Sequence, residues 1–292
     1  MPNGIIIIDK PQDWTSMDVC GKLRSIFREK RVGHAGTLDP MATGVLPVFV
    51  GRATRAVEFA AEGSKEYVAG LQLGVVTDTQ DTSGRELSRT EAHISREVLE
   101  QVLPPFRGEI FQIPPMYSAL KKDGKKLYEL ARKGKEVERQ PRPITIYELE
   151  VLEQSGADRF LLRVNCSKGT YVRTLCHDIG QALGCGGTMC SLRRTRAAGF
   201  DLSQAVTLEQ VLRAGEAGRA EELLRPVDTY FADVPALTIR GAAERKCRNG
   251  NSFPCAGKDG TYRVYGEDGA FLMLGRLGHG TMVTVKSFFE VN

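Results

Sequence analysis

Residues 33–44 read GHAGTLDPMATG, and this stretch interrupts the regular pattern in the first part of the 292-residue sequence. Its twelve residues include three Gly, one Pro and two Thr, a composition typical of an irregular loop. Strands are expected on both sides, at residues 4–9 and 45–50. Ser16 is expected to cap an intervening helix. The apolar residues of that helix are Val19, Leu23, Ile26 and Phe27.

The rest of the sequence indicates strands and helices in irregular alternation. Further strands are expected at residues 67–73, 144–152, 160–166 and 188–198, and an amphipathic helix at 170–183. Because several strands follow one another without a helix between them, the pattern favours an α+β fold over a doubly wound α/β fold. Beyond residue 228, short alternating runs and frequent Gly predict a small β-rich module. We therefore expect two domains, residues 1–228 and 229–292.

The composition is that of a globular protein, with 41% hydrophobic and 26% charged residues. No apolar run approaches the roughly 20 residues that cross a bilayer. The run at residues 5–8 is too short for the core of a secretory signal. Seven cysteines, an odd number without close pairs, indicate reduced thiols. These features predict a cytoplasmic protein without a membrane partner.

The positive charge is concentrated in two segments. Residues 121–142 contain nine Lys or Arg and four Asp or Glu, and residues 22–31 contain five and one. Their local charges of +5 and +4 leave −5 for the remaining chain, since the whole carries +4. Charge alone is compatible with two interpretations of these segments: a surface that binds a polyanion, and two solvated helix faces. A third cluster favours the polyanion; it comprises Arg193, Arg194 and Arg196.

Common cofactor and metal motifs are missing from the sequence. The glycine-rich stretches lack the Lys of a phosphate-binding loop, and no G-x-G-x-x-G follows a strand. The four His are scattered, and the cysteine spacings match no zinc pattern. A metal pair at Cys185 and Cys190 is conceivable, but small buried side chains explain them better. We expect no metal and no cofactor.

Asp39, in the loop at residues 33–44, has two interpretations. An Asp before Pro on a Gly-containing loop can simply form a turn, and local physics favours that interpretation. Alternatively, the loop presents a carboxylate to a substrate, since carboxylates act as nucleophiles or bases at sugar carbons. A single carboxylate without an obvious second one is unlike ordinary glycoside hydrolysis. Breaking and re-forming a bond on one base would need no activated water.

Long matching motifs occur in order along the chain. They are GIIIIDKP (4–11), GHAGTLDP (33–40), ATGVLP (42–47), KEY (65–67), TDTQD (77–81), QIPPMYSALK (112–121), GKKLY (124–128), RPIT (142–145), CSKGTYVR (166–173) and LRR (192–194). With these motifs the sequence resembles the TruB family, bacterial tRNA pseudouridine synthases that act in the T loop. The resemblance spans most of residues 4–200 and rests on long sequence motifs rather than on composition.

The resemblance implies a fold and a domain organisation. The expected fold has a central, mainly antiparallel mixed sheet flanked by helices and loops. A basic RNA-binding insertion is expected at about residues 104–145. The last sixty or so residues resemble the small RNA-binding module of the family, a PUA-like domain, more loosely.

The resemblance also implies roles for individual residues. Asp39 corresponds to the catalytic aspartate and Arg173 to the arginine that pairs with it, a cation that would keep Asp39 ionised. His34 corresponds to a residue that holds the flipped-out RNA conformation. Tyr67 corresponds to the tyrosine that stacks on the target base, although a strand Tyr is more often a core residue.

Further positions are implied for the nucleoside pocket and for the RNA backbone. Tyr171 and Leu192 correspond to pocket residues. The residues expected to contact phosphates are Lys125, Lys126, Lys133, Arg193 and Arg194. Lys10 and Asp81 lie in matching motifs without an assigned role.

The expected function is isomerisation of uridine to pseudouridine at position 55 of the tRNA T loop, by a monomer that flips the target base out of its stack. The expected partner is therefore the tRNA T stem-loop. Two alternatives remain: a non-catalytic RNA-binding or tRNA-folding protein on the same scaffold, and a nucleoside hydrolase that releases free uracil.

Overall fold

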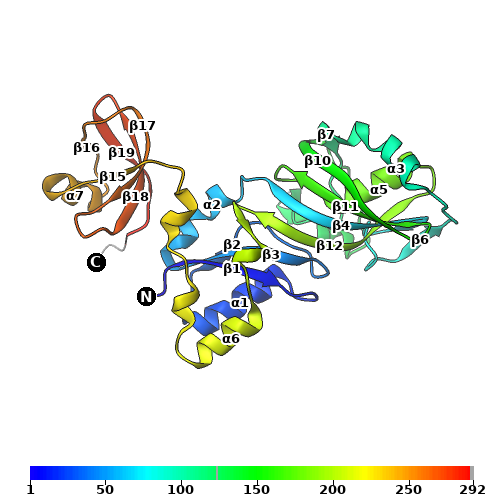
Figure 1. Ribbon diagram of the computed structural model, residues 1–292, viewed down its shortest axis with the longest axis horizontal. Coiled ribbons are helices and arrows are strands. Elements are labelled where there is room, and N and C mark those ends of the chain that lie inside the picture. The colour runs from blue at the N-terminus through cyan, green and yellow to red at the C-terminus, as the bar shows by residue number, and fades with distance from the viewer. Residues whose placement is uncertain (123, 290–292) are drawn as a thin grey trace.

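The computed structural model describes residues 1–122 and 124–289 (Figure 1). In these residues ten strands form one sheet, in the order β14-β1-β3-β12-β4-β11-β10-β7, with β2 pairing β3 and β13 pairing β12. The strands are β1 (Gly4–Lys10), β2 (Val32–His34), β3 (Thr43–Val50), β4 (Lys65–Leu73), β7 (Gly108–Gln112), β10 (Arg142–Ser155), β11 (Arg159–Cys166), β12 (Gly187–Ala197), β13 (Phe200–Asp201) and β14 (Val206–Thr207). The pairs β1–β14 and β12–β3 are parallel and the others antiparallel. The predicted α+β fold with a mainly antiparallel mixed sheet is confirmed.

Helices and short turns flank this sheet, and the last of the described helices packs on the C-terminal sheet instead. The α-helices are α1 (Ser16–Phe27), α2 (Val57–Ala60), α3 (Arg96–Val102), α4 (Leu127–Ala131), α5 (Val172–Ala182), α6 (Leu208–Glu216) and α7 (Gly241–Arg248). The 3₁₀ turns are η1 (Gly51–Ala56), η2 (Pro104–Phe106), η3 (Leu202–Gln204), η4 (Ala220–Leu223) and η5 (Val227–Phe231). Two small hairpins are β5 (Val75–Thr77) with β6 (Glu86–Arg89), and β8 (Lys121–Lys122) with β9 (Lys125–Lys126). The second hairpin and α4 belong to the basic segment at residues 121–142.

The start of α1 differs from the expectation. Thr15, not Ser16, is the N-cap: its hydroxyl accepts from the Asp18 amide, and the Asp18 carboxylate accepts from the Thr15 amide. This reciprocal capping box satisfies two amide groups that the helix leaves free. Ser16 becomes the first helical residue, and its buried hydroxyl is free to bond elsewhere.

Three apolar clusters pack on the main sheet. One joins the inward side chains of β4, β10, β11 and β12 to α5 and includes Leu38, Tyr67 and Leu192. A second packs β1 and β3 against α1 and α6 and includes Ile6 and Leu23. The third lies on the opposite face of β1 and β3 and includes Ile5 and Phe49. Since strand side chains alternate between faces, residues opposite each other share a face. The β4–β12 pairing sets Tyr67 opposite Arg194.

A second sheet forms the C-terminal part and lies at one end of the molecule (Figure 1). Its order is β15-β17-β18-β19-β16. The strands are β15 (Ala236–Thr238), β16 (Phe253–Pro254), β17 (Gly260–Tyr265), β18 (Phe271–Gly278) and β19 (Thr281–Ser287). This sheet has its own apolar cluster with α7, which includes Val264, Met273 and Met282. The predicted β-rich C-terminal module is thus confirmed, while the boundary between residues 228 and 229 stays a prediction.

Aromatic rings connect this module to the main domain. Phe231 lies 5.5 Å from Phe59, 6.3 Å from Phe271 and 5.8 Å from Phe288, measured between ring centroids. Lys286 forms an ion pair with Glu58 beside this cluster. The module is therefore packed against the main domain rather than only tethered to it.

Within the described residues, no helix is long and apolar enough to cross a membrane. All seven cysteines lie in that part of the chain and are free thiols.

Candidate active site

Asp39 lies in the loop between β2 and β3, with 38% of its side chain exposed. Hydrogen bonds on both sides hold it in place. The Ser16 hydroxyl accepts from the Leu38 amide at 2.9 Å and donates to the Leu38 carbonyl at 3.2 Å. The Ala42 amide donates to the Asp39 carbonyl at 3.0 Å. The loop therefore presents a partly exposed carboxylate from a fixed backbone.

Lys10 fixes the other side of the same loop. Its side chain is completely buried, and its Nζ donates to the carbonyls of Pro11 at 2.8 Å, Trp14 at 2.6 Å and Pro40 at 3.2 Å. Burial lowers the pKa of Lys10 to about 8, partly offset by Asp13 and Asp39. One ammonium group thus joins the end of β1, the start of α1 and the residue after Asp39.

Arg173, in the first turn of α5, holds the Asp39 carboxylate. Its Nε lies 3.0 Å from Asp39 Oδ2, and its Nη1 lies 3.6 Å from Asp81 Oδ2. Nη1 also donates to the Thr79 carbonyl at 3.0 Å, and Nη2 to the Tyr117 carbonyl at 2.8 Å. Each guanidinium nitrogen thus lies against an oxygen atom, through an ion pair at Nε and through hydrogen bonds at Nη1 and Nη2, and 7% of the side chain is exposed. The predicted pairing of Arg173 with Asp39 is present in the structure.

Asp81 is the second carboxylate on this guanidinium. Its side chain is 6% exposed and accepts hydrogen bonds from the Thr79 hydroxyl at 2.8 Å and the Ser83 amide at 3.0 Å. Arg173 therefore bridges two carboxylates of unequal exposure. Asp39 is the more exposed of the two and is the one that can meet a substrate.

Opposing effects act on the Asp39 carboxyl. Burial raises its pKa above the ordinary value and Asp81 adds to the rise, while Arg173 and Lys10 lower it. Arg173 acts in the expected direction, but burial outweighs it. The result is a carboxylate that is both desolvated and held by a cation, an environment that enzymes use to tune nucleophiles and bases.

Tyr67 and Leu192 lie in the apolar layer that also contains Leu38. Tyr67 is 7% exposed and Leu192 is 8% exposed. The fold thus places the two predicted pocket residues in the same apolar layer as Leu38, the residue before Asp39, although they are far apart in sequence. Their contacts with a base stay a prediction.

His34 ends β2, opposite Val48 of β3. Burial lowers its pKa, and the nearby Arg194 lowers it further, so the neutral imidazole is favoured. Its Nδ1 has no hydrogen-bond partner in the part of the chain that the structure describes. The predicted role of His34 in holding RNA stays a prediction.

Gln112 positions Tyr171 and was missed as a site residue by the sequence analysis. Its buried amide accepts from the Tyr171 amide at 3.0 Å and donates to the Tyr171 carbonyl at 3.2 Å. These two bonds hold the N-cap of α5 and so help to aim Arg173 two residues later. The available indication was a polar residue at the end of a strand within a matched motif.

Tyr171 also lines a hollow of about 500 Å³. Its other lining residues are Leu120, Arg142, Pro143, Ile144, Lys168 and Gly169. Two cations beside apolar and aromatic side chains suit a nucleotide better than a small anion.

The residues expected to contact the RNA backbone differ in exposure. Lys125 and Lys133 are exposed, and Lys126 is half-buried with its Nζ 5.4 Å from the centre of the Tyr128 ring. Arg193 is 43% exposed and pairs with Asp9 at 2.8 Å. These four side chains are accessible to a phosphate.

The expectation for Arg194 is wrong. Its side chain is completely buried, and its guanidinium donates to the Val45 and Gly36 carbonyls. Because strand residues alternate between faces, Arg193 points outward and Arg194 inward. Arg194 therefore does not present its charge to RNA at the surface.

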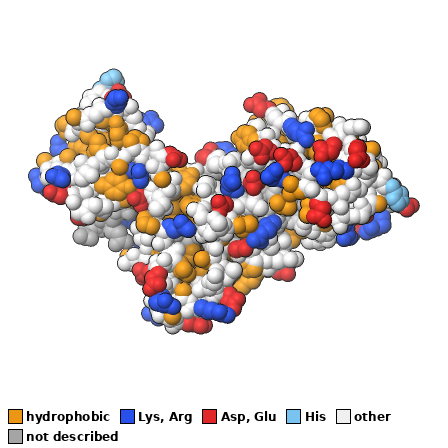
Figure 2. Space-filling view, in the orientation of Figure 1, with side chains coloured by type: hydrophobic (Ala, Val, Ile, Leu, Met, Phe, Trp, Pro, Cys, Tyr) orange, Lys and Arg blue, Asp and Glu red, His pale blue; other side chains and the backbone are white. Residues whose placement is uncertain are grey.

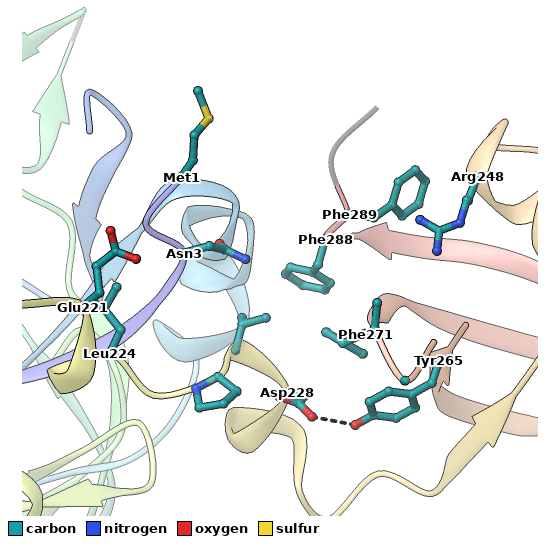
Figure 3. Close-up of a pocket in the computed structure, with 14 residues that line it drawn as sticks. Met1, Asn3, Glu221, Leu224, Asp228, Arg248, Tyr265, Phe271, Phe288 and Phe289 are labelled. Atoms are coloured by element: carbon teal, nitrogen blue, oxygen red, sulfur yellow. Dashed lines mark hydrogen bonds between the residues drawn. The ribbon is translucent and has the colours of Figure 1, made fainter. Parts of the chain in front are cut away.

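A larger hollow of about 720 Å³ lies between the main domain and the C-terminal module, next to the N-terminal residues Met1 and Asn3. Figure 2 shows the C-terminal module at the left, with a separate notch between it and the main domain on the upper side. Figure 3 shows Phe271, Phe288 and Tyr265 on one side and Leu224 and Asn3 on the other. None of the predicted catalytic or pocket residues lines it. The described residues also contain no group of three or more His, Cys, Asp or Glu arranged to hold a metal.

Family models cover most of this site, with the exception of Lys10 and Ser16, which precede residue 24. The model described as TruB family pseudouridylate synthase, N-terminal domain, matches residues 24–172, and that of the tRNA pseudouridylate synthase B C-terminal domain matches residues 173–232. The chain belongs to the TruB family. The first TruB model includes Asp39 and Tyr171, whereas Arg173 and Leu192 lie in the second, so the central ion pair joins the two matched regions.

Full-length TruB relatives extend the similarity to the C-terminal sheet. The tRNA pseudouridine synthase B of Dechloromonas aromatica (strain RCB) is 45% identical over 291 residues, covering 99% of this chain and 96% of that protein. That of Syntrophomonas wolfei is 43% identical over 299 residues, covering 99% of both. Pseudouridine synthases are isomerases, and the membership assigns that class of activity to the chain.

Solved structures share the fold of this TruB chain. A Cbf5–Nop10–Gar1 complex matches with a TM-score of 0.73 and 28% identity, covering 99% of this chain and 85% of that one. An H/ACA RNP bound to a substrate RNA containing 2′-deoxyuridine matches with a TM-score of 0.73 and 25% identity, covering 99% and 86%. The second of these neighbours binds RNA.

Proposed function

We propose that this chain isomerises uridine to pseudouridine at position 55 in the T loop of tRNA, with Asp39 as the catalytic group. The observation that carries the proposal is the partly exposed Asp39 carboxylate, 3.0 Å from the buried Arg173. Relatives at 43–45% identity are tRNA pseudouridine synthases, which supports tRNA as the substrate. A single reactive carboxylate on a rigid loop suits rearrangement on one base.

The reaction conserves all atoms. The bond between uracil N1 and ribose C1′ breaks, the base turns, and a bond forms between C5 and C1′, while the C5 proton is lost and N1 gains one. Asp39 assists as a nucleophile or as a base. The reaction involves no net oxidation or reduction, and we propose that it needs no cofactor or metal.

The target base has to leave its stack to reach Asp39, at a cost of about a few kcal/mol. Tyr67 and Leu192 form the apolar side of the proposed pocket, and His34 helps to hold the flipped RNA. Contacts to phosphates offset the cost and position the loop. We assign those contacts to Lys125, Lys126, Lys133 and Arg193, in a cytoplasmic monomer whose partner is the T stem-loop.

Incubation of the protein with unmodified tRNA and with an isolated T stem-loop tests the proposal. Pseudouridine mapped at position 55, without release of free base, is the expected result. An RNA with cytidine at position 55 serves as the matched control and should give no product. Free uracil would instead identify a hydrolase. Tight binding without any product would identify an RNA-binding or RNA-folding protein.

A further inference from the structure

We propose that Arg194 is a positioning residue that holds both ends of the catalytic loop and thereby sets the place of Asp39. This inference rests on the proposed role of Asp39. It replaces the surface role that the arginine-rich sequence around residue 194 predicted.

The side-chain geometry carries the proposal. Arg194 Nε donates to the Val45 carbonyl at 2.7 Å, and Nη2 donates to the Gly36 carbonyl at 3.1 Å. Gly36 precedes Asp39 in the loop and Val45 follows it in β3. A planar guanidinium with fixed donor directions therefore spans the base of the loop.

The backbone of Arg194 contacts the same loop. Arg194 pairs with Gly44 in the parallel ladder between β12 and β3. Gly44 has φ of +101°, and a Cβ at this position would lie 2.2 Å from the Arg194 carbonyl oxygen. Only glycine permits this approach, which brings the guanidinium within reach of both carbonyls.

The charge of Arg194 is unusual for a residue with a purely structural role. The side chain is completely buried, and no carboxylate among the described residues forms an ion pair with it. Its Nη1 is buried and makes no hydrogen bond of ordinary geometry within the same residues, although the cation is close enough to Tyr67 to oppose the rise that burial causes in the pKa of that hydroxyl. Burying an unpaired cation opposes folding, and apolar side chains often replace buried charges without loss of stability. Stability alone therefore does not explain an arginine here.

The charge of Arg194 also affects the pKa of neighbouring side chains. After burial, Arg194 is the main cause that lowers the pKa of both His34 and Lys65. His34 belongs to the proposed site, so the guanidinium lies close to the reacting region without reaching solvent. It acts on the substrate through the loop.

Two substitutions test the proposal. Arg194→Met keeps an unbranched apolar stem but removes the guanidinium and both of its hydrogen bonds. A displacement of about 1 Å at a reacting group can lower a rate by roughly 100-fold. We expect both kcat and the single-turnover rate on the T stem-loop to decrease by about 100-fold. The Kd for the stem-loop should stay within about threefold, because phosphate contacts dominate affinity. Arg194→Lys retains the charge and one donor group, so it should recover part of the rate.

Arg163→Met is the matched control. Arg163 lies in β11 of the same sheet, is 41% exposed and pairs with Glu150 rather than with the loop. Its kcat should equal that of the unchanged protein. Circular dichroism and thermal unfolding of all variants separate a displaced loop from a loss of fold.

The outcomes are distinct. A folded Arg194→Met protein with unchanged kcat, or with a raised KM alone, overturns the inference. If that variant does not fold, Arg194→Lys decides: a lowered kcat at unchanged Kd supports positioning, and full kcat overturns it. Asp39→Asn, measured in parallel, tests the proposed function itself. Substantial turnover by that variant would refute the role of Asp39 whatever the Arg194 variants do.

Discussion

The buried guanidinium of Arg173 contacts the partly exposed carboxylate of Asp39, with 3.0 Å between Nε and Oδ2. Arg173 is itself fixed by the carbonyls of Thr79 and Tyr117 and by the second carboxylate, Asp81. The proposed reacting group is thus held by a side chain that is itself fixed by three further contacts. Such preorganisation is what a catalytic carboxylate needs, and it makes the site open to specific tests.

Asp39→Asn should abolish catalysis while preserving binding. The amide keeps the size of the side chain but is neither a nucleophile nor a base, so turnover should fall by at least roughly three powers of ten. Binding of tRNA should stay within about tenfold. Rapid-quench assays of pseudouridine and filter binding measure the two quantities. Residual turnover near the normal level would disprove the assignment.

Replacing Arg173 should shift the pH dependence of the reaction. Arg173 lowers the pKa of Asp39 against the rise caused by burial. Without the cation this pKa rises further, so Asp39 becomes ionised only at higher pH. In Arg173→Met, the acid limb of kcat/KM on the stem-loop should therefore move to higher pH.

Arg173→Lys provides the control for that shift. It keeps a positive charge near Asp39 but loses the fork that also bonds Thr79 and Tyr117. We expect a lower rate with an acid limb much closer to that of the unchanged protein. Equal limbs in the Met and Lys variants would show that the charge of Arg173 does not act on the titrating group.

Lys125, Lys126 and Lys133 should contribute to the salt dependence of RNA binding. Changing all three to Gln removes three proposed phosphate contacts, so the log–log slope of affinity against salt should decrease by about 2, at ~0.7 per phosphate for non-duplex RNA. The control variant carries Arg213→Gln and Arg219→Gln, which replace two exposed arginines within and just after α6. An unchanged slope in the triple variant would identify the lysines as a solvated surface.

Removal of the C-terminal module should impair binding more than chemistry. A chain ending at residue 233 keeps Phe231, which packs on Phe59, but lacks Phe271 and Phe288. It should isomerise the stem-loop and show a raised KM for full-length tRNA, since the module would bind ground and transition states equally. Steady-state kinetics on both RNAs measure this. A folded but inactive truncated chain would place the module within the catalytic unit and contradict the boundary after residue 228.

Motifs and periodicity predicted different parts of the structure. Apolar runs and alternation were sufficient for the long strands β1, β3, β4, β10, β11 and β12 and for the α+β fold, because a strand of a packed sheet buries at least one face. The N-cap of α1 is Thr15 and not the predicted Ser16. Two neighbouring hydroxyl residues are equivalent as caps in the sequence, and only the backbone geometry selects one of them. Ser16 then serves the catalytic loop through Leu38.

The sequence by itself was sufficient to select Asp39 as the proposed reacting group and Arg173 as its partner, because both residues lie in long, specific motifs that match the TruB family. The sequence also showed the basic segment at residues 121–142, because charged residues can be counted directly along the chain. Only the tertiary structure decided which charges face solvent. Arg193 and Arg194 are adjacent in sequence, yet pairing of β12 with β3 and β4 turns one toward Asp9 and buries the other beneath the Asp39 loop. Side chains alternate across a strand, and long-range packing chooses which face is inside.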